Sequence, residues 1–411
     1  MSGANTAPNE RASLDAELSA VLPDAPNSVR LLLAIMAAVF IGFLVVGLAL
    51  PVLPLHVHQT LGMSPFIVGL VTGSQFIAAL ATRMWAGNYA DTRGAKRAVV
   101  IGLLAASASG FLYLCSIRVV ESRSVSVAIL LVGRALLGGG ESFIITGALG
   151  WGVAIAGPQR TGKVMAWMGT AMYAAFAAGA PVGTALYAHS GFASIAVATV
   201  AIPLTSLLLV YRLPSATVAA RAKASFLAVL KAVWVPGVAL ALSSIGFGAI
   251  TGFVALRFAD RGWQPVWPAF TAFAVAFMLA RMMFGHKIDA WGGPRVAFIC
   301  LFVEAAGQLL IWHADAALLA IVGAGLTGLG YSLIYPGLGV EAVRRAPQQS
   351  RALAMGAYTA CLDLTLGFGT AALGVLAGRA GFPMVFLVST AWILCAAPIA
   401  WRLTKTREDA A

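Results

Sequence analysis

The chain has 411 residues, of which 60% are hydrophobic and only 10% are charged, and its mean hydropathy is +0.89. About a quarter of the residues in a water-soluble domain are charged, because the surface must be solvated, so these values exclude a cytosolic globular protein. The net charge of +12 would suggest nucleic acid in a soluble protein. Here the basic residues fall in alternate loops, where orientation in a membrane explains them, and we expect no nucleic-acid partner.

Twelve apolar runs are long enough to cross the ~30 Å hydrocarbon core as helices. In chain order they lie at 30–53, 65–88, 97–117, 125–150, 163–187, 191–211, 234–256, 266–286, 296–312, 316–341, 351–377 and 382–402. The longest polar stretch between them, Leu213 to Val233, divides the runs into six plus six. We therefore expect an all-α membrane protein with twelve transmembrane helices in two six-helix, pseudo-symmetric bundles.

The positions of the basic residues predict the orientation. The N-terminal tail, the C-terminal tail and the loops after the even-numbered helices hold 19 of the 27 Lys and Arg residues, and the opposite loops hold five. Cytoplasmic loops retain an excess of Lys and Arg. We expect a monomer in the cell (inner) membrane with a cytoplasmic tail at 1–29, a bundle at 30–212, a cytoplasmic linker at 213–233, a second bundle at 234–402 and a cytoplasmic tail at 403–411.

The two halves of the sequence are related by a repeat. The segment from Arg83 to Arg97 matches the segment from Arg281 to Arg295 at an offset of 198, with six identical positions. A second series of matches, at an offset of 190, runs from Gly133 to Phe192. Parallel six-helix repeats place a substrate path between the halves near the bilayer midplane, and one half rocks on the other to alternate access. The repeat therefore predicts a transporter.

The loop between the second and third runs contains the pattern G-x-x-x-D-x-x-G-x-K/R-R, formed by Gly87, Asp91, Gly94, Lys96 and Arg97. A degenerate copy follows the eighth run, formed by Gly285, Asp289, Gly292 and Arg295. Over residues 30–402 the sequence resembles the major facilitator superfamily, in which this loop is the signature. The resemblance implies a role in gating. A role in helix packing and topology alone is the alternative.

Three further motifs resemble those of the twelve-helix exporters of that superfamily, and the chain is most similar to the arabinose-efflux-like permeases. They are Gly47 to Pro54 in the first run, Arg134 with Gly138 and Gly140 in the fourth, and the antiporter-like Gly179, Pro181 and Gly183 in the fifth. The antiporter pattern is interrupted by Ala180, and Thr184 replaces its last glycine. The resemblance implies proton-coupled export. Uptake of a sugar or organic acid by symport or facilitation stays open, as does a channel.

Charged residues inside the runs are the candidates for function, because a charge at the centre of a span costs about 2.5–3.5 kcal/mol on insertion scales. Arg134 and Glu141 are seven residues apart, so they share one helix face about 10 Å apart. We take Glu141 as the first candidate for binding a proton or substrate, with Arg134 adjusting it. The alternative for Glu141 is a structural salt bridge to an arginine such as Arg83.

Asp363, in the middle of the eleventh run, is the second candidate. An acid whose partner changes between two states can bind and release a proton, whereas the alternative is a hydrogen bond between helices. Glu304 is the weaker case, because the resemblance places the ninth helix on the outside of the bundle. Glu341 precedes Arg344 and Arg345 at a helix end, and we expect a salt bridge there.

Arg83 and Arg281 occupy equivalent places in the repeat, near the cytoplasmic ends of their helices. Each can extend toward water as a structural residue or bind an anion and take part in gating. Uncharged candidates for a cavity lining are Gln75, Tyr173, Tyr331, Tyr335 and Tyr358.

Several other classes of function are not expected. No histidine has the spacing of a metal ligand, no phosphate-binding loop suggests ATP, and no nucleophile–base set suggests an enzyme. We expect no metal and no cofactor. The expected partners are a small-molecule substrate, protons and the lipid bilayer.

Overall fold

The computed structural model describes residues 25–157, 160–215, 226–346 and 351–408, and within these ranges the chain is almost entirely helical. The elements of the N-terminal half are α2 (Ala25–Ala49), α3 (Leu53–Leu55), η1 (His56–Thr60), α4 (Pro65–Arg93), α5 (Ala95–Arg118), α6 (Arg123–Ala156) and α7 (Thr161–Arg212). Here η denotes a short π-helical turn.

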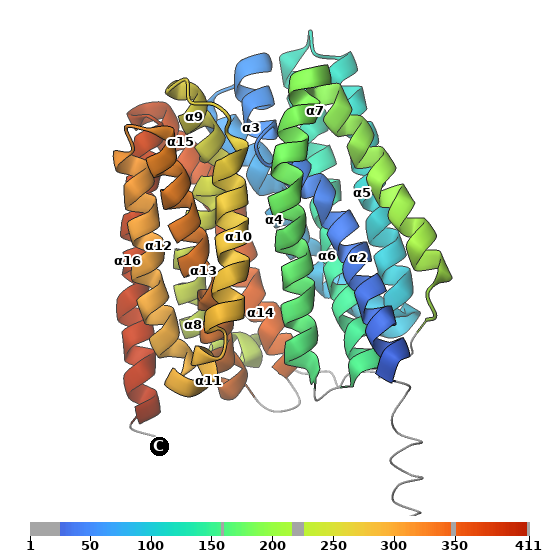
Figure 1. Cartoon of the computed structure of the whole chain (residues 1–411), viewed down its shortest axis with the longest axis vertical. Coiled ribbons are helices and arrows are strands. Elements are labelled where there is room, and N and C mark those ends of the chain that lie inside the picture. Colours follow the sequence, from blue (N-terminus) through green and yellow to red (C-terminus); the bar gives the residue numbers. More distant parts are fainter. Residues whose placement is uncertain (1–24, 158–159, 216–225, 347–350, 409–411) are drawn as a thin grey trace, which may run out of the picture.

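The C-terminal half continues with α8 (Phe226–Ala249), η3 (Ile250–Val254), α9 (Ala255–Asp260), α10 (Trp267–Phe284), α11 (Lys287–Trp291), α12 (Gly293–His313), α13 (Ala317–Arg345), α14 (Arg351–Leu364), η5 (Thr365–Gly369), α15 (Thr370–Ala380) and α16 (Phe382–Glu408). In Figure 1 this half (yellow to red) stands beside the N-terminal half (blue to green). The start of α2 and the end of α16 lie at the same end of the molecule.

The helices account for the predicted membrane spans. Eleven continuous helical segments of the described chain are long and apolar enough to cross a membrane. One of them, α7, contains two non-helical residues, Ser190 and Gly191, and the φ angle of Gly191 is +64°. The chain turns at this point, so α7 supplies two spans. The prediction of twelve transmembrane helices in an all-α protein is confirmed.

Several predicted boundaries differ from the observed helix ends. The first helix begins at Ala25, α8 begins at Phe226 within the predicted linker, and α16 continues to Glu408. The added ends of α2 and α16 carry polar residues, which can lie in the headgroup region and which hydropathy alone does not mark as helical. The added start of α8, Phe226 to Val233, is apolar apart from Lys231, and the prediction assigned it to the linker. Residues 1–24, 216–225 and 409–411 of the predicted tails and linker lie outside the described residues. The division into functional bundles stays a prediction.

Glycines let the helices within each half pack closely. A side chain at Gly102 on α5 would overlap the backbone of Gly140 on α6. In the C-terminal half, Gly307 on α12 faces Gly323 on α13 in the same way. Small residues at such crossings are the usual means of helix association in lipid, because lipid provides no hydrophobic force to hold helices together.

The two halves meet along two pairs of helices. At one contact, Gly69 and Gly73 of α4 lie against the backbone of η5 and the start of α15, and the Thr370 hydroxyl donates to the Gly69 carbonyl at 3.0 Å. At the other contact, the Thr271 hydroxyl of α10 donates to the Ala177 carbonyl of α7 at 3.0 Å. The interface between the halves therefore lies between α4 and α14–α15 on one side and between α7 and α10 on the other.

Candidate functional site

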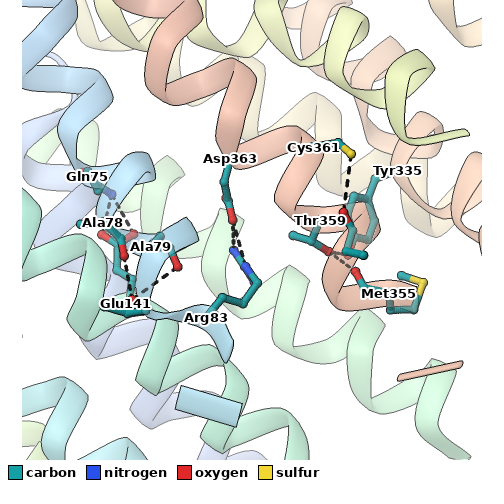
Figure 2. Close-up of polar contacts among 12 residues, drawn as sticks. Gln75, Ala78, Ala79, Arg83, Glu141, Tyr335, Met355, Thr359, Cys361 and Asp363 are labelled. Atoms are coloured by element: carbon teal, nitrogen blue, oxygen red, sulfur yellow. Dashed lines mark hydrogen bonds and ion pairs between the residues drawn. The ribbon is translucent and has the colours of Figure 1, made fainter. Parts of the chain in front are cut away.

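An ion pair joins the two halves. Arg83 on α4 donates to Asp363 on α14, with Nε 2.9 Å from Oδ2 and Nη2 also bonded to Oδ2. Figure 2 shows the arginine of one half reaching across to the aspartate of the other. The Asp363 side chain is 4% exposed and that of Arg83 is 22% exposed. Because the carboxylate is desolvated, its charge depends on Arg83 for compensation.

Glu141 lies in the N-terminal half and is bound to Gln75. The Nε2 atom of Gln75 on α4 lies 2.6 Å from Oε1 and 2.7 Å from Oε2 of Glu141 on α6, and this cluster is separate from the ion pair in Figure 2. The contact can form because Gly138, one turn before Glu141, has no side chain. A Cβ atom there would overlap the Gln75 backbone, so the glycine lets α4 and α6 approach closely. The fourth-helix glycine motif thereby places the amide beside the carboxylate.

Arg134 lies on α6, seven residues before Glu141, which is about two helical turns. Arg134 is 2% exposed, and its Nε and Nη1 atoms have no hydrogen-bond partner among the described residues. Among the described residues no salt bridge joins Arg134 to Glu141, and a joint role of the two residues stays a prediction. Arg83 is not bonded to Glu141, since its hydrogen bonds go to Asp363.

Aromatic rings from both halves pack together at the interface. We call this set the aromatic cluster; its members are Phe76, Tyr173, Phe247, Phe273, Phe277 and Tyr331. The Tyr173 ring of α7 stacks on the Phe277 ring of α10, with centroids 3.5 Å apart and planes 18° apart. Phe247 of α8 stacks on Tyr331 of α13, and the Tyr331 hydroxyl lies 3.2 Å from the Ser244 hydroxyl. Two of the predicted lining tyrosines therefore belong to this cluster.

The other two predicted tyrosines, Tyr335 and Tyr358, lie on α13 and α14 of the C-terminal half. The Tyr335 hydroxyl is 2.7 Å from the Thr359 hydroxyl, a contact seen in Figure 2. Tyr358 is fully buried and donates to the Tyr335 carbonyl at 2.9 Å. Tyr358 therefore acts as a link between α13 and α14 and not as a lining residue.

Arg281 on α10 borders the aromatic cluster. Its guanidinium lies 4.8 Å from the centre of the Phe277 ring, and Nη2 donates to the Ser332 carbonyl at 2.9 Å. Within the part of the chain that the structure describes, no carboxylate forms a salt bridge with Arg281. A cation beside an aromatic face and without an anionic partner can bind an anionic group.

The signature loop lies at the ends of α4 and α5, away from these residues. Gly94 caps α4 with φ +101°, and Gly292 caps α11 with φ +85°. Lys96 donates to the carbonyls of Tyr211 and Leu213 at the end of α7. The copy in the C-terminal half has its Asp289 in the first turn of α11 and its Arg295 in the first turn of α12.

The two exporter-like motifs of the first and fifth spans contact each other. Side chains at Gly179 and Gly183 of α7 would overlap the backbone of Gly47 and Leu48 on α2. Pro181 lies between these glycines, within a continuous helix. The motif residues therefore bring α2 and α7 close together beside the interface.

Two further acids, Glu341 and Glu304, are buried in the C-terminal half. Glu341 accepts hydrogen bonds from Arg344 and Arg345, so the predicted salt bridge is confirmed. Glu304 is 0% exposed and lies on the face of α12 that packs against α8 and α13. The opposite face of α12 is exposed at Ile299, Phe302 and Leu309, so the helix has an outer face while its acid is turned inward. Among the described residues no group of three His, Cys, Asp or Glu side chains could hold a metal.

Comparison with known families identifies the fold. A family model described as the Major Facilitator Superfamily matches residues 35–267 and 258–411. The chain belongs to the major facilitator superfamily. This is a family of transporters and not of enzymes, and the chain is an integral membrane protein.

Relatives of similar length support the assignment. The chain is 41% identical to the uncharacterized MFS-type transporter STM4428 of Salmonella typhimurium, over 91% of this chain and 96% of the relative. It is 38% identical to the uncharacterized MFS-type transporter YhhS of Escherichia coli, over 94% and 96% of the two chains.

Solved superfamily structures share the fold at low sequence identity. A bacterial homologue of the human lysosomal transporter Spinster, in an inward-facing and unoccupied conformation, has a TM-score of 0.72 at 12% identity, covering 93% of this chain and 98% of that one. The human organic anion transporter MFSD10 has a TM-score of 0.67 at 15% identity, covering 92% and 100%. The nucleoside transporter NupG has a TM-score of 0.67 at 16% identity, covering 91% and 99%.

Proposed function

We propose that this superfamily member is a proton-coupled secondary transporter that exports a small molecule from the cytoplasm by alternating access. The observation that carries the proposal is the ion pair between Arg83 and Asp363 across the two halves. Rocking of one half on the other changes the distance between residues on opposite halves. A buried pair that bridges them must therefore be rearranged in each transport cycle.

Protons would act on this pair through competition for Arg83. The arginine is bonded to Asp363, and it lies on the same helix, α4, as Gln75, which binds Glu141 in the same half. A proton on Asp363 removes the negative charge that holds the bridge and leaves Glu141 as the remaining anionic partner. A proton on Glu141 has the opposite effect. Proton binding at these acids would then bias which conformation the halves adopt.

The substrate would bind between the halves, beside the aromatic cluster and Arg281. Aromatic rings supply stacking surfaces for planar or drug-like molecules and for sugar faces, and Arg281 supplies a positive charge without a carboxylate partner among the described residues. Two neighbours in fold are named as an organic anion transporter and a nucleoside transporter. Both kinds of molecule carry planar or anionic groups that these side chains would accommodate.

The proposed orientation places both termini in the cytoplasm and the protein in the inner membrane as a monomer. The excess of Lys and Arg in alternate loops supports it. In this orientation the close contacts of Gly69 and Gly73 with η5 and α15 close the periplasmic end of the interface. The signature loop then lies at the cytoplasmic ends of α4 and α5, where it would act in gating and not in substrate binding.

Uptake by proton symport or facilitated diffusion is the second candidate, because the same ion pair could serve either direction. The contact between Gly179 and Gly47 favours export, since these glycines belong to the motifs that resemble the exporters. A channel fits poorly, because a channel does not require a pairing that breaks in each cycle.

The deciding experiment uses purified protein in liposomes that enclose a pH-sensitive dye and are challenged with a panel of sugars, nucleosides, organic anions and drug-like cations. Proton-coupled transport predicts a pH change inside the vesicles with one substrate class, and its sign gives the direction of coupling. If Asp363 is the coupling acid, the Asp363→Asn variant should abolish the signal; if Glu141 is, the Glu141→Gln variant should do so. Substrate movement that continues without any proton movement would rule out coupling and leave a facilitator.

A further inference from the structure

Glu304, in the middle of α12, is a carboxyl group without a partner. Its exposed fraction is 0%, and neither Oε1 nor Oε2 has a hydrogen-bond partner among the described residues. The salt bridges of the described chain do not include it either. The other acids buried in the helices differ: Glu141 has Gln75, Asp363 has Arg83, and Glu341 has two arginines.

The carboxyl group lies inside the C-terminal half and not against lipid. A Cβ atom at Gly246 of α8 would lie 2.5 Å from Oε1 of Glu304, and a Cβ atom at Gly330 of α13 would overlap the Glu304 amide nitrogen. The Ile393 side chain of α16 also approaches Gly246. Helices α8, α12, α13 and α16 therefore surround the acid.

The internal repeat shows that packing does not require an acid at this position. Gly140 and Gly330 are equivalent glycines at the offset of 190. Gly140 packs on the amide nitrogen of Ala106, as Gly330 packs on that of Glu304. Ala106 is thus the counterpart of Glu304, and it is also 0% exposed. The N-terminal half fills the same place with a methyl group, so the carboxyl group in the C-terminal half needs another explanation.

Among the described residues, no salt bridge supplies Glu304 with a cation. The titratable side chains close to it by position are Cys300, one helical turn before it on α12, and Tyr331, which follows Gly330 on α13. The nearest basic residues along its own helix, Arg295 and His313, are each nine residues away, or about 13 Å along the axis. On the surrounding helices the basic residues are also distant along the chain from the residues beside the acid: Arg257 and Lys231 are 11 and 15 residues from Gly246, Arg344 is 14 residues from Gly330, and Arg402 is nine residues from Ile393.

We propose that Glu304 is a proton-binding site that holds its proton in this conformation. An ionised carboxylate without a partner in an apolar interior costs many times more free energy than a neutral acid that lacks one hydrogen bond. A proton removes the charge and needs no space. A metal ion would need several oxygen ligands around it, whereas Oε1 is packed against Gly246 and the adjacent Gln308 amide nitrogen is directed to the Gly246 carbonyl.

The site is connected to the interface between the halves through Tyr331. Tyr331 follows Gly330, the glycine that packs on the Glu304 amide, and it stacks on Phe247 and has its hydroxyl beside that of Ser244. Loss of the proton would place a negative charge on the side of α13 that carries Gly330, next in sequence to Tyr331 of the aromatic cluster. A rearrangement of α8 against α12 that admits water would provide the route for release. The proposal concerns the protonation of one side chain and holds whichever substrate the protein carries and whether or not Asp363 is the coupling acid.

The test is the infrared difference spectrum between wild-type protein and Glu304→Gln, both purified in detergent at neutral pH. We expect the carbonyl band of a protonated carboxylic acid in the wild type and its loss in the variant. Glu304→Gln should melt close to the wild type, because glutamine has nearly the same shape as the neutral acid. Glu341→Gln is the matched control: it removes a buried acid paired with Arg344 and Arg345, so it should lose a carboxylate band and melt earlier.

Two outcomes would overturn the proposal. One is a difference spectrum in which Glu304→Gln loses an ionised carboxylate band. The other is a melting temperature that rises with sodium chloride over choline chloride in the wild type and not in Glu304→Gln, which would make the site a sodium site. If Glu304→Gln does not fold, Glu304→Ala replaces it in the same difference measurement, because alanine is the residue at the equivalent position, Ala106. None of these measurements involves transport, so failure of the proposed export function leaves the result intact.

Discussion

Arg83 and Arg281 hold equivalent positions in the two halves, but only Arg83 has a carboxylate partner among the described residues. The repeat aligns Asp363 with Tyr173, so the counterpart of the ion pair is Arg281 beside Tyr173 and Phe277. One contact between the halves is therefore held by opposite charges and the other by aromatic packing. In the proposed function, the first side would respond to protons and the second would offer a cation to the substrate.

Exchange of the charges tests the ion pair. Arg83→Asp and Asp363→Arg should each slow transport strongly, because each leaves two like charges across the interface. The double variant should recover part of the rate, with a coupling free energy of about 0.5–3 kcal/mol in a double-mutant cycle. The partial exposure of Arg83, at 22%, places the expected value in the lower part of that range.

The control for the charge exchange is Arg345→Ala. It breaks a hydrogen bond to Glu341 at a helix end, while Arg344 still pairs with that acid. We expect normal transport from this variant. If the exchanged pair is no more active than the single variants, the contact between Arg83 and Asp363 does not serve transport.

The orientation can be tested by labelling. In a background that lacks Cys115, Cys300, Cys361 and Cys395, single cysteines at Ser225 and Thr406 should resist an impermeant thiol reagent in intact cells. A cysteine at Ser122, between α5 and α6, should react. The expectation follows from the excess of basic residues in the loops on the side of Ser225 and Thr406. Labelling of Ser225 or Thr406 in intact cells would invert the topology.

The fold was predictable because the bilayer restricts the choices. Any span must be a helix of about 20 apolar residues, so the runs alone located the helices, and the offsets of 198 and 190 revealed the halves. The sequence also indicated the turn at Gly191, because the predicted fifth run ends at 187 and the sixth begins at 191.

The candidate site was only partly predictable. The cost of a charge in a span identified Arg83 and Asp363 as individually significant, but their pairing spans 280 residues and depends on how the two halves dock. Neither spacing nor periodicity carries that information. Glu304 shows a different difficulty: its residue type made it a candidate, but the sequence did not tell which face of α12 it occupies, and the structure places it on the buried face. The close packing of Gly246 and Gly330 against Glu304 depends on how α8 and α13 pack on α12, which the sequence does not reveal.

The backbone of the signature loop gives a stability prediction. Gly94 has φ +101°, a conformation that residues with a side chain rarely adopt. Gly94→Ala should therefore cost about 1–3 kcal/mol and lower both the melting temperature and the transport rate, while substrate affinity stays within a few-fold because the loop is remote from the aromatic cluster. Gly150→Ala is the control, since its helical backbone tolerates a methyl group and no atom lies within 4 Å of the added Cβ. A large loss of affinity in Gly94→Ala would place the loop in the binding site.

Glu141→Gln separates a coupling role from a structural one. The glutamine keeps the shape and much of the hydrogen bonding with Gln75, but it cannot bind and release a proton. If Glu141 carries the coupling proton, the variant should exchange substrate down its gradient, fail to accumulate it against a proton gradient, and show a flat pH profile of binding. Gln75→Ala is the matched variant, because it removes the contact and keeps the titrating acid; its binding should still depend on pH, with a shifted profile.

Asp363→Asn, measured in parallel, distinguishes the two acids, since only loss of the coupling acid preserves exchange while removing accumulation. Uphill transport by Glu141→Gln with an unchanged pH profile would make Glu141 a structural partner of Gln75 and Arg134, and would leave Asp363 as the acid to which coupling must be assigned.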